Sequence, residues 1–479
     1  MDTREVDVAI IGAGTAGMVA YQQARKVTDR VLLMESDQYG TTCARVGCMP
    51  SKLLIAAAEH AEVVRRAPTF GVQAPPPGID GAAVMDRVRR ERDRFAGGTA
   101  KTVEGFPAHH RLMGRVRFLA PGRLMVGDHT EVSAGRIVIA TGSRPHVPDM
   151  LRSAGDRLVV NDDVFDWTTL PESVAVFGPG PIGLELGQAL ARLGVRVRLF
   201  GVGGGVGGLR SEDLRDAALA RFRDEFPIDP AADVTGVQKT GEQVAVRWRD
   251  ADGTEHGETF DYLLAATGRR PNVDTLDLQN SGLALDDRGA PVFNVHTLQC
   301  GDQPVFIAGD ANGYRPLLHE AADEGRIAGR NAAHWPEVRA GLRRVPLSVV
   351  FTDPQIVSVG ARLPELEHRD DGFAVGSVSF ENQGRCRVIG RNYGGLHVYG
   401  EYGSGRFLGA EILGPEAEHL GHLLAWSVQQ RMTVTEMLAM PYYHPVIEEG
   451  LRTALKQLNR ALARGPEPAE GCLECGPGA

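Results

Sequence analysis

Two segments of the chain share one pattern, an apolar run followed at once by G-x-G-x-x-G. Residues 6–11 lead into Gly12-Ala13-Gly14-Thr15-Ala16-Gly17 and a helix expected from Met18. Residues 174–177 lead into Gly178-Pro179-Gly180-Pro181-Ile182-Gly183 and a helix expected from Leu184. In a strand–turn–helix unit, such glycines let the backbone turn sharply and approach a pyrophosphate, which the helix N-terminus favours. One match alone is weak, but two in this context predict two dinucleotides and two Rossmann-like domains.

Further residues fit the two nucleotide sites. Glu35 follows the next apolar run, about 20 residues beyond the first glycines, where an acid holds the adenosine ribose hydroxyls. Two more apolar runs end in Ala-Thr-Gly, at Thr141-Gly142 and at Thr267-Gly268. A fifth run, residues 305–308, leads to Gly309-Asp310, and this aspartate is placed to reach the ribityl or phosphate part of a flavin. The fifth run therefore predicts a strand that returns to the first domain, with the second domain inserted in it.

From about residue 345 the pattern changes. Residues 394–399 and 407–412 alternate like antiparallel strands, and helical segments follow around 419–430 and 448–462. We therefore expect an α/β protein with two doubly wound domains and a C-terminal α+β domain. The expected limits are 1–150 and 271–344 for the first domain, 151–270 for the second, 345–465 for the third and 466–479 for a flexible tail.

Composition excludes several classes of protein. The chain of 479 residues is long enough for about three domains. Its net charge of -9 argues against a general nucleic-acid partner, and no apolar stretch is long enough for a membrane span. The first residues run straight into a strand without a signal peptide, so a cytoplasmic location is expected. Six cysteines in a chain of this length do not form a secreted disulfide framework.

The segment with the most potentially reactive side chains is residues 40–52, which read Gly-Thr-Thr-Cys-Ala-Arg-Val-Gly-Cys-Met-Pro-Ser-Lys. Cys43 and Cys48 can lie on one face near the start of a helix, where the dipole favours thiolate. Thiolate attacks disulfides and can donate charge to an oxidised flavin. The alternatives are two buried apolar cysteines or half of a metal site, but no second Cys/His pair with zinc-like spacing lies nearby. We therefore expect a redox pair and no metal site.

This segment resembles the active-site signature of the pyridine nucleotide-disulfide oxidoreductases, the family that includes dihydrolipoamide dehydrogenase, glutathione reductase and mercuric reductase. The resemblance runs from Val6 to about Leu462 and includes both dinucleotide turns and the two Ala-Thr-Gly ends. It also includes Gly309-Asp310 with residues 318–321, residues 351–354 and the pattern His-Pro-x-x-x-Glu at 444–449. The resemblance implies FAD, a nicotinamide coenzyme and a homodimer formed through the C-terminal domain.

The resemblance also implies roles for the residues around the cysteines. Cys48 would be the thiol beside the flavin, and Cys43 would be the interchange thiol that attacks the substrate disulfide. Lys52, one helical turn beyond Cys48, would approach flavin N5 and pair with Glu185.

By the same resemblance, His444 would be the general acid–base, supplied by the other subunit and oriented by Glu449. The chemistry agrees, because thiol–disulfide exchange needs a group that cycles its proton near neutral pH. A carboxylate on the far ring nitrogen would fix the tautomer of the histidine and raise its basicity. The alternative for His444 is a capping histidine before a helix.

Several substrates are compatible with the sequence, and lipoamide on a lipoyl protein is the leading expectation. Two electrons would pass from the dithiol to Cys43 and Cys48, to FAD and then to NAD. No basic glutathione pocket is recognisable, and the chain ends Cys472-Leu473-Glu474-Cys475 where mercuric reductase has an adjacent pair. The alternatives are an NADPH-dependent reductase of mercuric ions or of a small disulfide with a C-terminal cysteine relay, and a flavin-binding accessory subunit specific for one protein partner.

The coenzyme is less constrained than the flavin. Gly201 stands where an NAD-specific relative has an acid, so nothing obvious repels a 2′-phosphate, and Arg210 could bind one. Gly183, as the third glycine of its turn, resembles NAD users instead. The sequence thus favours NAD(H) and leaves NADP(H) open.

Two departures from the family pattern leave alternatives open. Arg45 replaces a common Asn, and could add a positive charge beside the cysteines or simply lie at the surface. The Cys472/Cys475 pair could be a mobile second redox pair, a site for a soft metal ion or an incidental tail.

Overall fold

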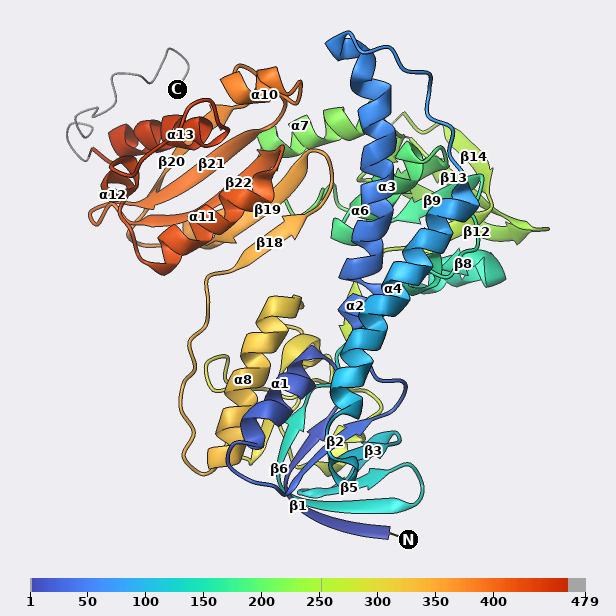
Figure 1. The fold of residues 1–479 in the computed structure, drawn as a ribbon, viewed down its shortest axis with the longest axis vertical. Coiled ribbons are helices and arrows are strands. Elements are labelled where there is room, and N and C mark those ends of the chain that lie inside the picture. The colour runs from blue at the N-terminus through green and yellow to red at the C-terminus, as the bar shows by residue number, and fades with distance from the viewer. Residues whose placement is uncertain (1, 251, 464–479) are drawn as a thin grey trace.

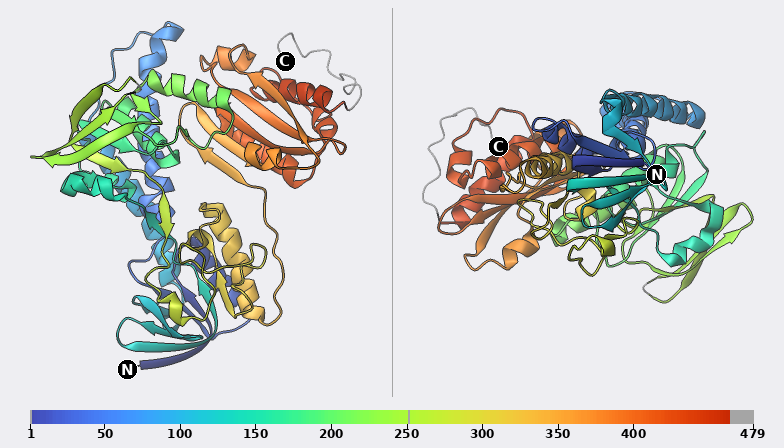
Figure 2. Two further views of the ribbon diagram at one scale, coloured as in Figure 1. Left: turned by 180° about the vertical axis from the view of Figure 1, so that it is seen from behind. Right: turned by 90° about the horizontal axis from the view of Figure 1, so that it is seen from below.

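The structure is a computed structural model, and it describes residues 2–250 and 252–463. Figures 1 and 2 show a first domain around the N-terminus, a second domain beside a long pair of helices, and a C-terminal domain that an extended segment joins to α8 (Leu318–His334). No helix in the described residues is long and apolar enough to cross a lipid bilayer.

The first domain is built on one sheet with the order β3-β2-β1-β6-β5-β4, and β17 also pairs with β6. Strands β1, β2, β3, β6 and β17 run parallel, whereas β5 pairs antiparallel with β4 and β6. The return of β17 to this sheet makes the first domain discontinuous, as the sequence predicts. The strands are β1 Asp2–Ile11, β2 Val31–Glu35, β3 Arg111–Met113, β4 Val116–Ala120, β5 Arg123–Val126, β6 Thr130–Ile139 and β17 Val305–Ile307.

The second domain has a parallel sheet of order β11-β10-β9-β15-β8. A separate antiparallel sheet, β12-β13-β14, follows β11 and was not foreseen from the sequence. The strands are β8 Leu158–Val159, β9 Ser173–Phe177, β10 Arg196–Phe200, β11 Ile228–Asp229, β12 Asp233–Thr240, β13 Gln243–Arg249, β14 Glu255–Phe260 and β15 Tyr262–Ala265.

The C-terminal domain has an antiparallel sheet of order β18-β19-β22-β21-β20. Helices α11 (Ala417–Gln429) and α13 (Glu448–Ala461) pack on this sheet through one shared apolar core (Figure 1). The alternating pattern from residue 345 onward therefore predicts this sheet correctly. The strands are β18 Leu347–Val350, β19 Gln355–Gly360, β20 Phe373–Ser379, β21 Gly395–Glu401 and β22 Phe407–Gly414.

The helices after the two glycine turns begin earlier than the sequence predicts. Helix α1 spans Thr15–Ala24 and α6 spans Pro181–Arg192, so both start inside the turn motif rather than at Met18 and Leu184. The physical reason is that the third glycine is already helical. A Cβ at Gly17 would lie 1.8 Å from the carbonyl oxygen of Gly12, so only glycine permits this close packing.

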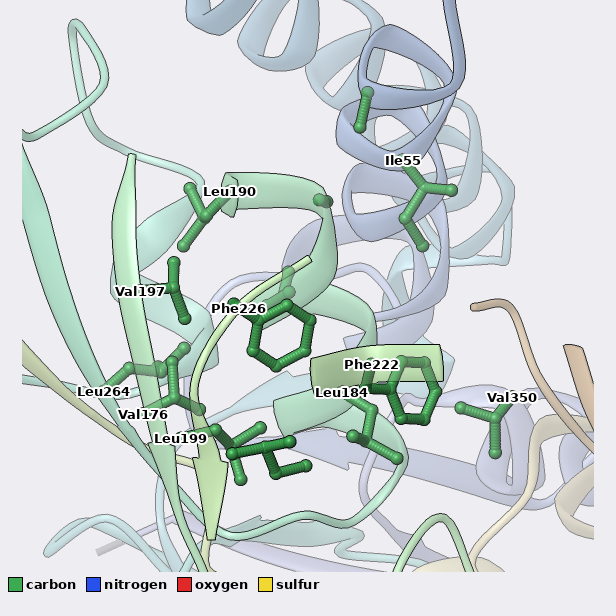
Figure 3. Packing of buried hydrophobic residues seen from close by; sticks show 14 of the residues in the cluster. Ile55, Val176, Leu184, Leu190, Val197, Leu199, Phe222, Phe226, Leu264 and Val350 are labelled. Carbon is green, nitrogen blue, oxygen red and sulfur yellow. The ribbon is translucent and has the colours of Figure 1, made fainter. Parts of the chain in front are cut away.

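Helix α3 (Cys48–Arg66) is held against the second domain by a buried apolar cluster. Figure 3 shows Ile55 of α3 at the same cluster as Leu184 of α6 and Phe222 of α7 (Glu212–Arg223). Full burial of such a side chain stabilises the folded state by about 1.5–3 kcal/mol. This packing fixes the first turn of α3 relative to α6, and both helices contribute to the candidate active site.

Candidate active site

The two cysteines lie on two helices rather than on one. Cys43 lies in the short helix α2 (Thr42–Val46), and Cys48 is the first residue of α3. Gly47 separates them with φ of -128° and ψ of -118°, which ends one helix before the next begins. A Cβ at Gly47 would lie 3.1 Å from the Cα of Cys43. The expectation of a single helix was therefore wrong, and the break at glycine is what folds Cys48 back toward Cys43.

The two thiols have opposite acidities. The hydrogen bond from Cys43 and the positive charge of Lys52 lower the pKa of Cys48 to about 7. The same hydrogen bond, together with burial, raises the pKa of Cys43. Cys48 also stands at the N-terminus of α3, where the helix dipole favours an anion. The reduced pair therefore holds its negative charge on Cys48 and its proton on Cys43.

Lys52 is held by a carboxylate and an aromatic ring. Its Nζ donates to Glu185 Oε2 at 2.7 Å and lies 4.6 Å from the ring centroid of Phe351. Glu185 Oε1 accepts from the backbone N–H of Phe351 at 2.9 Å, so one buried acid links α3, α6 and the segment after β18. The ammonium lies one turn beyond Cys48, where its positive charge favours the thiolate.

A second layer of contacts, which sequence reasoning missed, holds Phe351 in place. The Gln188 side chain donates to the carbonyl oxygen of Asp353 and accepts from its backbone N–H, both at 2.8 Å. Arg192 pairs with Glu225 at 2.7 Å and with Asp353 at 3.1 Å. Both residues lie on α6, but their partner Asp353 is more than 160 residues away, so no local sequence signal identifies them.

The first glycine turn has the features of a pyrophosphate cradle. Gly12 has φ of +104°, and a Cβ there would lie 2.3 Å from the carbonyl oxygen of Ala140. A Cβ at Gly14 would meet nothing within 4 Å, and no side chain caps the first turn of α1. The amide groups at this helix N-terminus are therefore open to an anion.

Groups around this turn fit the rest of FAD. Glu35 Oε2 accepts from the backbone N–H of Ala13 at 2.8 Å, which places the acid at the turn. The hydroxyl of Thr141 is buried without a hydrogen-bond partner in the described residues, and Gly142, with φ of +71°, follows it. Asp310 Oδ2 accepts from the Ser143 hydroxyl at 2.6 Å. FAD bound here would supply two-electron transfer between the thiol pair and the coenzyme.

Glu324 of α8 was not among the predicted residues, although it orders the flavin motif. It is fully buried, and its Oε2 accepts from the Gly309 backbone N–H and from Asn312 Nδ2, both at 2.7 Å. Burial raises the pKa of Glu324, while an ion pair with Arg343 at 2.7 Å opposes that rise. This network fixes the turn from which Asp310 projects.

The second glycine turn repeats the first. Gly178 has φ of +107°, a Cβ at Gly183 would lie 1.9 Å from the Gly178 carbonyl oxygen, and a Cβ at Gly180 would meet nothing within 4 Å. Gly268, after β15, has φ of +99°. A Cβ at Gly201 would lie 2.6 Å from Pro179 and 2.7 Å from the Pro230 carbonyl oxygen. An acidic side chain at position 201 would therefore not fit in this backbone.

His444 and Glu449 form a hydrogen-bonded pair in the C-terminal domain. His444 Nδ1 and Glu449 Oε1 are 2.7 Å apart, and Glu449 Oε2 accepts from the Val446 backbone N–H at 3.2 Å. The glutamate side chain is 5% exposed and the histidine side chain 57% exposed. The far ring nitrogen, Nε2, is therefore directed away from the acid. Within the described residues, no hydrogen bond or ion pair joins His444 to the cysteines of the same chain.

The two departures from the family pattern have different outcomes. Arg45 Nη1 donates to the Gln38 carbonyl oxygen at 3.3 Å, and its side chain lies against Gly40. The lowered pKa of Cys48 is caused by Cys43 and Lys52. Cys472 and Cys475 lie outside the described residues.

Comparison with known proteins agrees with this site. A family model described as pyridine nucleotide-disulphide oxidoreductase matches residues 6–325, and its dimerisation domain matches residues 346–455. The chain belongs to this family. It is therefore an FAD-dependent disulfide oxidoreductase with two nucleotide-binding domains and a dimerisation domain.

Individual relatives divide between two activities. A dihydrolipoyl dehydrogenase of Halobacterium salinarum is 31% identical over 94% of this chain and 95% of its own length. A mercuric reductase of Shigella flexneri is 32% identical over 95% of this chain and 81% of its own length.

Among solved structures, LpdA of Mycobacterium tuberculosis has a TM-score of 0.80 at 24% identity, covering 95% of this chain and 100% of its own. The copper(II) complex of the flavoprotein disulfide reductase RclA C43S mutant from Escherichia coli has a TM-score of 0.80 at 22% identity, covering 95% and 99%. Both structures support the fold.

The thiolate on Cys48 gives a pH-dependent prediction. In the reduced enzyme, the thiolate should appear as pH rises through about 7, because the folded protein lowers the pKa of Cys48 to that value. Lys52→Met removes the positive charge, so the midpoint should rise by about one unit. The measurement is a difference titration of thiolate ultraviolet absorbance against Cys48→Ser. Lys26→Met, an exposed lysine of the first domain, is the control. An unchanged midpoint in Lys52→Met would contradict the assignment.

Proposed function

We propose that this enzyme is a dihydrolipoyl dehydrogenase, which oxidises the dithiol of lipoamide on a lipoyl protein. The substrate dithiol becomes a disulfide while the Cys43–Cys48 disulfide is reduced to two thiols. Re-oxidation of that pair through FAD delivers a hydride equivalent to NAD⁺ and releases one proton. NAD⁺ is thus the terminal oxidant and accepts both electrons of the dithiol.

The observation that carries this proposal is the His444–Glu449 pair. Exchange between thiols and a disulfide moves a proton on and off sulfur at each step, and His is suited to that task near pH 7. Reduction of a metal ion needs electrons, but it does not need a proton delivered to a leaving sulfur. A histidine whose tautomer is fixed by a buried carboxylate therefore supports a disulfide-exchanging substrate.

We propose further that His444 serves the cysteines of a partner subunit. The match to a dimerisation-domain model supports a homodimer. Leu423 and Trp426, one turn apart on α11, are 41% and 67% exposed in the single chain, and Tyr443 beside His444 is 79% exposed. Large apolar side chains exposed together are typical of an interface.

The length of the relatives supports lipoamide over mercuric ion. The match covers 95% of the Halobacterium salinarum dihydrolipoyl dehydrogenase, but it covers 81% and 84% of two mercuric reductases. A second candidate remains an NADPH-dependent mercuric-ion or disulfide reductase with a C-terminal cysteine relay, supported by the equal identity of those reductases. A flavin-binding accessory subunit for one protein partner is the candidate of another class.

We propose NAD(H) as the coenzyme, because an acid lies next to Gly201 on the neighbouring strand. Asp229 of β11 pairs in register with Phe200 of β10, and its carbonyl oxygen accepts from the Gly201 backbone N–H at 2.7 Å. Its charge at this sheet edge would disfavour a 2′-phosphate. Arg210 is exposed, and its backbone N–H donates to Glu411 of the dimerisation domain at 3.0 Å.

The test is the initial rate of coenzyme reduction by dihydrolipoamide, measured with NAD⁺ and with NADP⁺. A faster rate with NAD⁺ is the expected result. Removing the negative charge in Asp229→Asn should weaken the preference for NADH over NADPH. The ratio of the NADPH dissociation constant to the NADH dissociation constant should fall by about tenfold, which is about 1.4 kcal/mol. Asp233→Asn, an exposed acid at the start of β12, is the matched control. A fast rate with NADP⁺ alone would overturn the coenzyme proposal, and no rate with either would favour the reductase candidates.

A further inference from the structure

Three potential metal ligands meet at the edge of the first domain that lies away from the flavin turn. Asp29 is in the loop before β2, and His109 and His110 are in the 3-10 turn at Ala108–His110 immediately before β3. Strands β1, β2 and β3 are parallel neighbours, so residues that precede β2 and β3 share the amino-terminal edge of the sheet. Gly12 follows β1 at the opposite, carboxyl-terminal edge. The cluster is therefore separate from the nucleotide sites.

The spacing of the three side chains suits a metal ion. Each offers one ligand atom, and these atoms all lie within 4.8 Å of one another. His110 Nε2 and Asp29 Oδ1 are 3.7 Å apart. Around a zinc ion with bonds of about 2.0–2.2 Å, two tetrahedral ligand atoms are about 3.4 Å apart. Small side-chain adjustments would bring this set to bonding distance.

His110 supplies the independent sign that a ligand belongs here. Its side chain is 2% exposed, and its Nε2 has no hydrogen-bond partner in the described residues. Buried polar nitrogen atoms in native proteins almost always have a partner, because an unpaired one costs about 1–3 kcal/mol. This nitrogen is directed toward Asp29, and the two histidine rings are adjacent, with centroids 4.2 Å apart.

The other side of the His110 ring is prepared for metal binding. Its Nδ1 is 2.9 Å from the hydroxyl of Tyr21, which stacks on Phe106 and is buried. When Nδ1–H donates to the Tyr21 hydroxyl oxygen, Nε2 keeps its lone pair for a metal ion.

We propose that Asp29, His109 and His110 bind one divalent d-block cation of the class that prefers imidazole, such as Zn²⁺, Cu²⁺ or Ni²⁺. Two nitrogens and one carboxylate oxygen form the protein ligands, and water completes the coordination because Asp29 and His109 are exposed. Arg25 also contacts Asp29 Oδ1, so the cation shares or displaces that ion pair. The sequence predicts no such site because its ligands come from loops that are far apart along the chain.

The bound ion would join the loop before β2 to the turn before β3. Because the unfolded chain holds no such arrangement, the ion binds the native state preferentially and raises the unfolding temperature. The site uses no cysteine and lies outside the redox machinery, so turnover should not depend on it.

The test is to titrate the oxidised, FAD-loaded full chain with Zn²⁺ alone and to measure the binding by isothermal titration calorimetry. Wild type should bind one more Zn²⁺ per subunit than His109→Gln and Asp29→Asn, or bind it at least about tenfold more tightly. His334→Gln, an exposed histidine at the end of α8, should behave as wild type. Any Zn²⁺ bound elsewhere is common to all variants and cancels in the comparison.

Tyr21→Phe tests the tautomer without removing a ligand. Because the variant lacks the hydroxyl that accepts from Nδ1–H, its affinity for Zn²⁺ should fall by about 10–100-fold. Zn²⁺ should raise the melting temperature of wild type and His334→Gln but not that of His109→Gln, with FAD content and turnover unchanged in all of them. Equal stoichiometry, affinity and melting shift in wild type, His109→Gln and Asp29→Asn would overturn the proposal.

Discussion

Replacing Cys43 by serine is expected to leave FAD bound and to lower disulfide-coupled turnover by at least about 10³-fold. The reason is covalent: the interchange thiol forms the bond to substrate sulfur, and a serine hydroxyl cannot form or release a disulfide. The shared proton of the pair is held on Cys43, whose pKa is raised by its hydrogen bond to Cys48 and by burial. In the reduced pair, Cys43 must therefore lose its proton to a base before it can attack, whereas Cys48 carries the negative charge of the thiolate.

Two half-reactions distinguish this loss from misfolding. Stopped-flow spectroscopy should show that Cys43→Ser is still reduced at the flavin by the coenzyme but fails to exchange with dihydrolipoamide. Cys386→Ser is the matched control, because that buried thiol, whose pKa is raised to about 12 by burial, lies in the C-terminal domain and has no role in the proposed chemistry. Full turnover by Cys43→Ser would refute the assignment of Cys43 as the interchange thiol.

His444→Ala is expected to slow thiol–disulfide exchange by about 10²–10⁴-fold, the usual contribution of a positioned general acid–base. Reduction of the flavin by the coenzyme should change little, because hydride transfer from the coenzyme moves no proton on or off a thiol. Glu449 holds Nδ1 at 2.7 Å, so Glu449→Gln should produce a smaller loss of the same kind by weakening the fixed tautomer. Equal losses in both half-reactions would count against an acid–base role.

Mixed dimers test which subunit supplies the histidine. If His444 serves the partner, a dimer of one Cys43→Ser chain and one His444→Ala chain has one complete site. After random mixing, activity should therefore return to about one quarter of wild type, because half of the dimers are heterodimers with one of two sites intact. If His444 served its own chain, mixing the two inactive variants would restore nothing.

Local patterns determined the fold class and the nucleotide turns. Gly17 and Gly183 are recognisable from sequence because their constraint is local: the carbonyl oxygen of the first glycine of the same turn lies 1.8 or 1.9 Å from where a Cβ would be. Gly12 and Gly178 are recognised by the same motif, although the carbonyl oxygens that exclude a Cβ there, those of Ala140 and Ala266, come from distant strands. The change to alternating apolar residues after residue 345 likewise indicates an antiparallel sheet, since alternation is a property of each strand by itself. The match to the family extends these expectations over residues 6–325 and 346–455.

Tertiary structure alone decided how the cysteines differ. Sequence spacing suggested one helix for Cys43 and Cys48, but Gly47 breaks it, and the acidity of Cys48 depends on a lysine that Glu185 of another domain holds in place. Glu324, Gln188 and Arg192, which hold the flavin turn and the loop of Phe351, were also beyond prediction, because their partners are distant in sequence. The cluster of Asp29, His109 and His110 emerged for the same reason. Spacing along a chain fixes which residues share a local turn, whereas a pKa or a ligand set depends on distances that only the packed domains create.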